Sequence, residues 1–188
     1  MSEPNSLRQV PVLLALANAG RPRRPKGATA TQVDDPFAAS APAQALLEPL
    51  VPGLVVKVED LPDLRALAHE VSAIATALTG EAALPAPTEL NRLARRSPGW
   101  RELVVVDRAL RSQTRWGDSP AASQVARLVI DELGRLDPAR LKMCARPECT
   151  LLFYDSTRPN SQRWHLQETC GWRERQRRHR TQVRSGKP

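Results

Sequence analysis

Four side chains in the last third of the sequence have the types and spacing of metal ligands. Cys144 and Cys149 are separated by four residues, fifteen residues follow, and His165 and Cys170 are again separated by four. Thiolate and imidazole groups suit a tetrahedral zinc ion, and four such ligands leave no coordination position for water or a substrate. The pattern therefore predicts one zinc ion with a structural role.

The histidine is the ligand for which the sequence leaves alternatives. A gap of four residues is at the long end of usual ligand spacing, so His179 or a water molecule remains an alternative to His165. The three cysteines are an odd number and do not form a disulfide framework. Thiolate ligands need a reducing compartment, so we expect the protein in the cytoplasm.

The residues around these ligands carry three further short segments. They are Leu152-Phe153-Tyr154-Asp155, Arg163-Trp164-His165 and Cys170-Gly171-Trp172-Arg173. In type and order they resemble the CGNR zinc finger family, over about the last fifty residues. The family's third cysteine is replaced here by His165, and its signature asparagine is replaced by Trp172. The resemblance implies a zinc finger with a Cys3His ligand set.

The excess positive charge of the chain is concentrated in this region. Residues 139–188 contain twelve Lys and Arg against four Asp and Glu, which accounts for the whole net charge of +8. Such segregation is typical of a module that binds a polyanion and is joined to a neutral domain. We expect the contacts with nucleic acid, duplex DNA in the first instance, from a C-terminal helix that carries Arg173, Arg175, Arg177, Arg178, Arg180 and Arg184.

The elements that position these residues follow from hydrophobic periodicity. Apolar residues at helical spacing predict a long helix over 64–78, which begins after Asp60 or Asp63 and ends at Gly80, and a further helix that starts after Ser119 as its cap. Residues 10–18 fit either a buried strand or the start of a helix. Shorter helices are expected over 41–50 and 88–95, and strands over 54–58, 103–107 and 113–116, the last two forming a hairpin with 107–111 as its turn.

Within the finger, Cys144 and Cys149 should form a knuckle followed by a strand over 150–154. Alternation places Leu151 and Phe153 on one face of this strand, and the chain then turns back towards Trp164. Cys170 begins the last helix, on which Trp172 is expected to pack against the finger. The basic run 21–26 is interpreted as a solvated loop. The predicted fold class is α+β: helices with a small antiparallel sheet over 1–139, and a treble-clef-like zinc finger with a basic helix over 140–188.

The N-terminal part is similar to the ABATE domain, which precedes the CGNR finger in bacterial proteins described as stress-induced transcription regulators. The matching residues are Leu14 to Asn18, Leu64 to Leu67, Leu90-Asn91 and the approach Arg140-Leu141-Lys142-Met143-Cys144. The resemblance implies a transcription regulator.

The sequence thus predicts a zinc-dependent DNA-binding protein. The alternative is a zinc-stabilised module that binds RNA or an acidic protein. An enzyme is not expected, because no H-E-x-x-H, phosphate-binding glycine loop or Ser-His-Asp pattern is present. No apolar run approaches the ~20 residues of a membrane span. Neither the oligomeric state nor an effector follows from the sequence.

Overall fold

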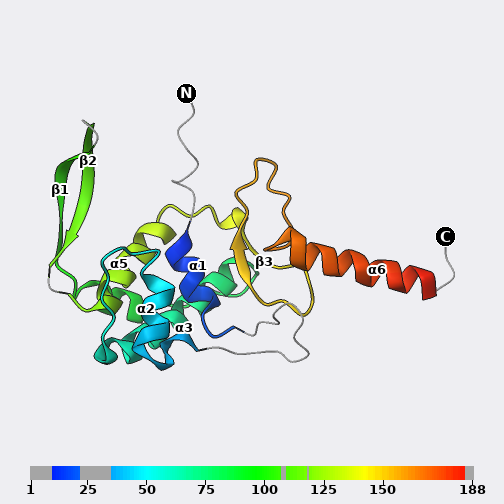
Figure 1. Cartoon of the computed structure of the whole chain (residues 1–188), viewed down its shortest axis with the longest axis horizontal. Coiled ribbons are helices and arrows are strands. Elements are labelled where there is room, and N and C mark those ends of the chain that lie inside the picture. Colours follow the sequence, from blue (N-terminus) through cyan, green and yellow to red (C-terminus); the bar gives the residue numbers. More distant parts are fainter. Residues whose placement is uncertain (1–9, 22–34, 107–108, 118, 185–188) are drawn as a thin grey trace.

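The computed structural model describes residues 10–21, 35–106, 109–117 and 119–184. Within these ranges it contains six α-helices and two antiparallel sheets of two strands each, so the predicted α+β class is confirmed. A helical body occupies the centre, a two-stranded arm projects from one side, and the last helix projects from the other (Figure 1). No helix in the described ranges is both long and apolar enough to cross a membrane.

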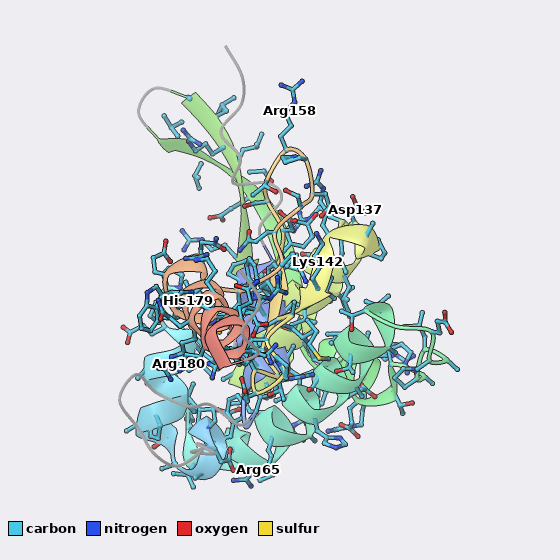
Figure 2. The ribbon with its side chains drawn as sticks, turned by 90° about the vertical axis from the view of Figure 1, so that its right-hand side faces the viewer. Arg65, Asp137, Lys142, Arg158, His179 and Arg180 are labelled. Carbon is cyan, nitrogen blue, oxygen red and sulfur yellow. The ribbon has the colours of Figure 1, made fainter. Side chains whose placement is uncertain are left out.

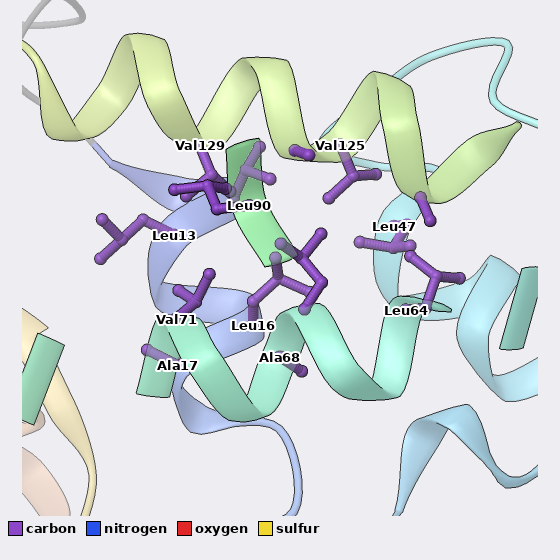
Figure 3. Packing of buried hydrophobic residues seen from close by; sticks show 14 of the residues in the cluster. Leu13, Leu16, Ala17, Leu47, Leu64, Ala68, Val71, Leu90, Val125 and Val129 are labelled. Atoms are coloured by element: carbon purple, nitrogen blue, oxygen red, sulfur yellow. The ribbon is translucent and has the colours of Figure 1, made fainter. Parts of the chain in front are cut away.

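The helical body consists of five helices around one hydrophobic core. Leu13 and Leu16 on one helix, Leu64 on another and Val125 on a third are completely buried and point into the same space (Figure 3). Apolar residues three and four positions apart form one face of each helix, and burying these faces together stabilises the body. The helices are α1 (Pro11–Asn18), α2 (Ser40–Leu47), α3 (Leu61–Leu78), α4 (Thr88–Ala94) and α5 (Ala121–Leu133).

The N-terminus of α1 is capped by a side chain from α5. The Glu132 carboxylate accepts hydrogen bonds from the backbone N–H of Val12 at 3.2 Å and of Leu13 at 2.6 Å. These are two of the N–H groups that a helix cannot satisfy internally, and an anion there also interacts favourably with the helix dipole. Burial raises the pKa of Glu132, and the two hydrogen bonds oppose that rise. Within the predicted segment 10–18, residues Pro11–Asn18 form a helix, and the side chain that caps it comes from a distant segment.

The cap of α5 also comes from a distant residue. Asp60 is buried, and its carboxylate accepts hydrogen bonds from the N–H of Ala121 at 3.0 Å and of Lys57 at 3.0 Å. The prediction that Ser119 caps this helix was wrong, since no cap hydrogen bond comes from a side chain next to α5. Asp60 lies directly before α3, as expected, but its side chain does not cap that helix.

The strand predicted over 54–58 is absent. Leu54 and Val56 are buried and Val55 is exposed, which is the alternation of a strand, but no strand in the described part of the chain pairs with them. The Gln44 side chain makes the hydrogen bonds that a neighbouring strand would make. Its amide donates to the carbonyl of Leu54 at 2.7 Å and accepts from the N–H of Val56 at 2.8 Å. The segment then continues into a 3-10 turn, η3 (Val58–Asp60).

The predicted hairpin is confirmed as strands β1 (Gly99–Val106) and β2 (Ala109–Trp116). They pair antiparallel from Gly99 opposite Trp116 to Val106 opposite Ala109. The expected turn 107–111 was too long, since 109–111 belong to β2, and 107–108 lie outside the described residues. The hairpin is the arm that projects from the body in Figure 1.

The second sheet connects the finger to the body. Strand β3 (Leu141–Met143) pairs antiparallel with β4 (Leu152–Tyr154). The chain after β4 turns back towards Trp164, as predicted, and among the described residues the strand that pairs with β4 is β3. Leu141 and Leu152 also belong to the hydrophobic core of the body. Leu152 and Phe153 are both buried and Leu151 is partly buried, so burial does not alternate between the two faces of this strand. A domain boundary at 139/140 stays a prediction.

Candidate metal centre

The first two predicted ligands lie in the tight loop between β3 and β4. Cys144 follows β3 directly, and its N–H donates to the carbonyl of Leu151 at 2.9 Å, which extends the β3 and β4 pairing by one step. The N–H of Cys149 donates to the carbonyl of Arg146 at 2.9 Å and closes a turn between the two cysteines. This loop, residues 144–149, is called the knuckle below. It presents both thiols on one side.

The other two ligands are brought to the knuckle by the chain beyond β4. The N–H of Ala145 donates to the carbonyl of Arg163 at 2.8 Å, which holds the segment before His165 against the knuckle. Cys170 lies in a π-helical turn, η5 (Gln167–Gly171), that leads into the last helix, α6 (Trp172–Arg184). Short π-helical turns are rare and often occur at functional sites. Here the wider turn places a ligand beside a helix start.

The four side chains form a compact group with the geometry that zinc requires. Their ligand atoms all lie within 4.8 Å of one another. The Nδ1 atom of His165 is 3.4 Å from the Cys149 sulfur and 3.6 Å from the Cys170 sulfur. A tetrahedral zinc ion with ordinary bond lengths separates sulfur from nitrogen by about 3.5 Å. The site therefore fits one zinc ion, and zinc would supply a cross-link among three segments of the finger.

The electrostatics of the group also favour a cation. Burial raises the pKa of the Cys149 thiol to about 12, and the neighbouring Cys144 and Cys170 add to the rise. Burial and Cys144 likewise raise the pKa of Cys170. Three thiolates so close together are unfavourable without a compensating positive charge, which a divalent zinc ion provides. Four protein ligands fill all the coordination positions of a tetrahedral ion, which is the arrangement of a structural zinc site.

Two neighbouring groups favour the thiolate forms. The backbone N–H of Leu151 donates to the Cys149 sulfur, and the Arg146 side chain hydrogen-bonds Cys170, and each of these contacts lowers the pKa of its thiol. Three thiolates, one neutral imidazole and a divalent ion carry one net negative charge. Arg146 therefore lies where its guanidinium offsets that charge.

His165, rather than His179, lies with the cysteines. His179 is exposed on α6 and does not belong to the ligand group. Figure 2 views the molecule from the end at which α6 projects and labels His179 on this helix. The geometry thus brings together the four residues that the sequence identified first.

Asp155 holds the loop between β4 and His165 in place. It is completely buried and accepts hydrogen bonds from Lys142 Nζ at 2.7 Å and from the N–H of Thr157 and Gln162 at 2.9 and 2.7 Å. Burial opposes ionisation of this carboxyl, but the hydrogen bonds outweigh it and hold its pKa well below the usual range. Lys142 also donates to the carbonyl of Asn160 at 2.8 Å, so β3 and the loop are fastened at several points.

Gly171 permits a close approach of the helix start to an aromatic ring. A Cβ atom at this position would lie 3.3 Å from the Trp164 ring and 2.9 Å from the Gln167 side chain. The Arg163 guanidinium lies over the Trp164 ring, with its central carbon 5.3 Å from the ring centre. Trp164 is thus partly buried between the start of α6 and Arg163.

The side chains of Asn18 and Arg21 connect the finger to the helical body through contacts that the sequence did not predict. Asn18 donates to the carbonyl of Leu152 at 2.9 Å and accepts from its N–H at 2.8 Å. Arg21 donates to the carbonyl of Thr150 at 2.8 Å and to the Ser72 hydroxyl at 2.9 Å. The interpretation of Arg21 as part of a solvated loop was wrong, and residues 22–26 lie outside the described residues. The contacts with Leu152 and Thr150 join residues more than a hundred positions apart, so no local pattern predicts them.

The predicted nucleic-acid contacts lie on α6, which extends away from the body (Figure 1). Arg175, Arg177, Arg178 and Arg180 are exposed, and Arg173 is partly buried. The side chain of Arg184 lies outside the described residues.

The buried Glu174 organises two of these arginines. Its carboxylate is 2.7 Å from Arg177 and 3.2 Å from Arg178, both of which remain 56% exposed. Hydrogen bonds from Arg177, followed by those from Arg178, lower the pKa of Glu174 to about 2, although burial opposes the shift. Figure 2 shows one further arginine, Arg158, at the tip of the loop that follows β4.

Comparison with known proteins identifies the finger. No curated protein matches the chain. The family model of the CGNR zinc finger matches residues 140–182, a range that includes all four ligands and most of α6. The resemblance of the N-terminal part to the ABATE domain stays a prediction. The family match and the geometry of the ligand group together support a zinc-binding finger of the CGNR type at residues 140–182.

Proposed function

We propose that this protein binds DNA through α6 and acts as a transcription regulator in the cytoplasm. The observation that carries the proposal is the placement of the arginines. A helix of thirteen residues, about 20 Å long, projects from the zinc-binding finger and bears exposed arginines on several sides. Like-charged side chains at this density repel one another, and a row of phosphates relieves that repulsion.

The dimensions of α6 suit the major groove of duplex DNA, which is about 12 Å wide and admits one helix. Arg177 and Arg180 follow Arg173 at intervals of four and three residues and so form one stripe, while Arg175 and Arg178 lie beside it. A helix that carries arginines on more than one side can contact both phosphate rows that border a groove. Arg158 adds an exposed cation from a separate loop.

Zinc has a structural part in this proposal. The ligand group lies immediately before α6, and Cys170 is in the turn that starts the helix. About fifty residues bury too little surface to fold unaided, and structural zinc contributes on the order of 10 kcal/mol to such modules. The four-ligand set supports a binding role rather than catalysis, because no position is left for a substrate.

The test is the salt dependence of binding to a 16-base-pair duplex, measured by fluorescence anisotropy on the zinc-loaded protein. Each phosphate contact contributes about 0.9 to the slope of log affinity against log salt, so Arg177→Ala should lower the slope by about one. Arg95→Ala, an exposed arginine on the body at the end of α4, is the matched control and should leave it unchanged. Equal affinities for the full chain and a chain ending at Gly171 would refute the role of α6.

A further inference from the structure

Trp172, the residue in place of the family's asparagine, is unusually exposed. It does not pack into the finger as predicted from the sequence, because 53% of its surface is accessible. Among the described side chains, it is the only aromatic one in the group of large exposed hydrophobic residues. Trp164, by contrast, is partly buried beside Gly171. Trp172 is therefore available for a ligand.

The indole of Trp172 lines a hollow between the knuckle and α6. The hollow has a volume of about 400 Å³, within the range of ~300–1,000 Å³ that is usual for small-molecule sites. Its cationic side chains come from both walls: Arg146 from the knuckle, and Arg173, Arg177 and Arg180, beside Trp172, from α6. Two carboxylates also line it, Glu148 paired with Arg146 at 2.8 Å and Glu174 paired with Arg177 at 2.7 Å, so the arginines outnumber the acids.

This combination suits a nucleotide better than a simple anion. Arginines alone attract phosphate, sulfate or carboxylate equally well, but an exposed indole beside them adds a flat surface on which a base stacks. Trp172 and Arg180 are about 12 Å apart along the helix axis, so the same hollow can contact a base and the phosphates that flank it. An acidic peptide would satisfy the arginines and leave the indole without a matching ring.

The base that reaches Trp172 must be unpaired. In a duplex both faces of a base are covered by its neighbours, so a tryptophan can stack only on a base that is single-stranded or turned out of the helix. Trp172 also lines the hollow at the base of α6, where a ring can lie against its indole.

We propose that the hollow beside Trp172 binds an unpaired base of a nucleic-acid strand by stacking, while Arg173, Arg177 and Arg180 contact the flanking phosphates. This inference rests on the proposed nucleic-acid binding of α6 and specifies the form of ligand that the finger prefers. It assigns to Trp172 a contact with the base and to the arginines the sequence-independent contacts with the backbone.

The experiment compares three fluorescein-labelled probes with the zinc-loaded full chain: a sixteen-residue oligothymidine, an abasic strand of the same length and charge, and a 16-base-pair duplex. One stacked base is worth a factor of about five or more in affinity, so oligothymidine should bind at least about fivefold more tightly than the abasic strand. Trp172→Ala should bring the affinities for oligothymidine and the abasic strand to the same value and leave the salt slope unchanged. Trp172→Phe should keep most of the ratio between these two affinities.

Direct contact is checked by tryptophan fluorescence. Oligothymidine should quench part of the emission of the parent protein, and that part should be missing in Trp172→Phe although the variant still binds. Leu110→Ala, which removes an exposed apolar side chain from the distant arm, is the matched control and should retain the full ratio.

The two proposals fail in different ways. Equal affinity of the parent protein for oligothymidine and the abasic strand, or a ratio that survives in Trp172→Ala, would overturn the base-stacking site while binding to the duplex persists. Absence of binding to all three probes would overturn nucleic-acid binding itself. Zinc content and circular dichroism of Trp172→Ala equal to the parent's would show that the loss of the ratio is local.

Discussion

Asn18 and Leu152 are paired in the way that residues of two neighbouring strands are paired. The side-chain amide of Asn18 donates to the Leu152 carbonyl at 2.9 Å and accepts from the Leu152 N–H at 2.8 Å. The backbone N–H and C=O of Leu152 on the open edge of β4 are thus hydrogen-bonded by a side chain at the end of helix α1, where a third strand would otherwise pair. An open strand edge exposes unpaired backbone groups, so this contact both protects the edge and fastens the finger to the body.

Replacing Asn18 with Ala should therefore destabilise the protein. Two backbone groups of Leu152 would lose their partners in a partly buried place, and each such loss costs about 1 kcal/mol or more. We expect urea unfolding of the zinc-loaded protein to show a fall of roughly 1–3 kcal/mol in the free energy of unfolding. Asn91→Ala, an exposed asparagine on α4, is the control. An unchanged midpoint in Asn18→Ala would mean that the finger does not depend on α1.

Zinc should be bound at one ion per chain, and Cys149→Ser should abolish this binding. Without the metal, residues 144–184 should lose their protection against amide hydrogen exchange, because zinc provides most of the folding free energy of the finger. Helix α3 should keep its protection, since its buried face packs on α1, α4 and α5 rather than on the ligand group. Ser156→Ala in the exposed loop after β4 is the control. Loss of protection in α3 as well would show that the finger and the body fold as one unit.

The histidine ligand has its own test. His165→Cys should retain zinc, because thiolate and imidazole both suit the ion, whereas His165→Ala should weaken zinc binding by more than the ~10- to 100-fold cost of losing an outer contact. His179→Ala should have no effect, because His179 lies outside the ligand group. Competition with a chromogenic chelator measures all three affinities. Normal zinc affinity in His165→Ala would contradict the assignment and open a position for water.

Glu132 should make stability depend on pH through a group far from the zinc site. Burial raises its pKa in the folded protein above the ordinary value of 4.5, despite the hydrogen bonds from Leu13 and Val12 and the charge of Arg135. The folded state therefore holds this proton more tightly than the unfolded chain. Its contribution to stability is complete below the unfolded pKa and is lost as pH rises through the folded pKa.

The comparison that isolates this effect is with Glu132→Gln, which does not titrate. Relative to this variant, the parent should lose free energy of unfolding as pH rises above the ordinary pKa of 4.5 and through the raised pKa of the folded state, and then level off. Urea unfolding at several pH values measures the difference, and Glu81→Gln at an exposed position serves as the control. A difference between parent and Glu132→Gln that stays constant with pH would contradict the raised pKa.

The zinc ligands could be predicted because their signal is local and chemically rare. Cys144 to Cys170 span few residues, and the three cysteines and one histidine in that span have little other reason to cluster. The helices were predictable for a similar reason, since a buried helical face repeats every three to four residues within one segment, as in α3. The segregation of arginines onto α6 is likewise a property of composition along the chain.

The contacts between distant segments could be decided only by the tertiary structure. Asp60 caps α5, Glu132 caps α1, and Gln44 replaces a strand beside Leu54, and no local pattern distinguishes these side chains from other polar residues. The pairing of β4 with β3 and the contact of Asn18 with Leu152 depend on how the helical body and the finger are arranged in space. Secondary structure follows from periodicity within a segment, whereas caps, strand partners and the exposure of Trp172 follow from which segments meet.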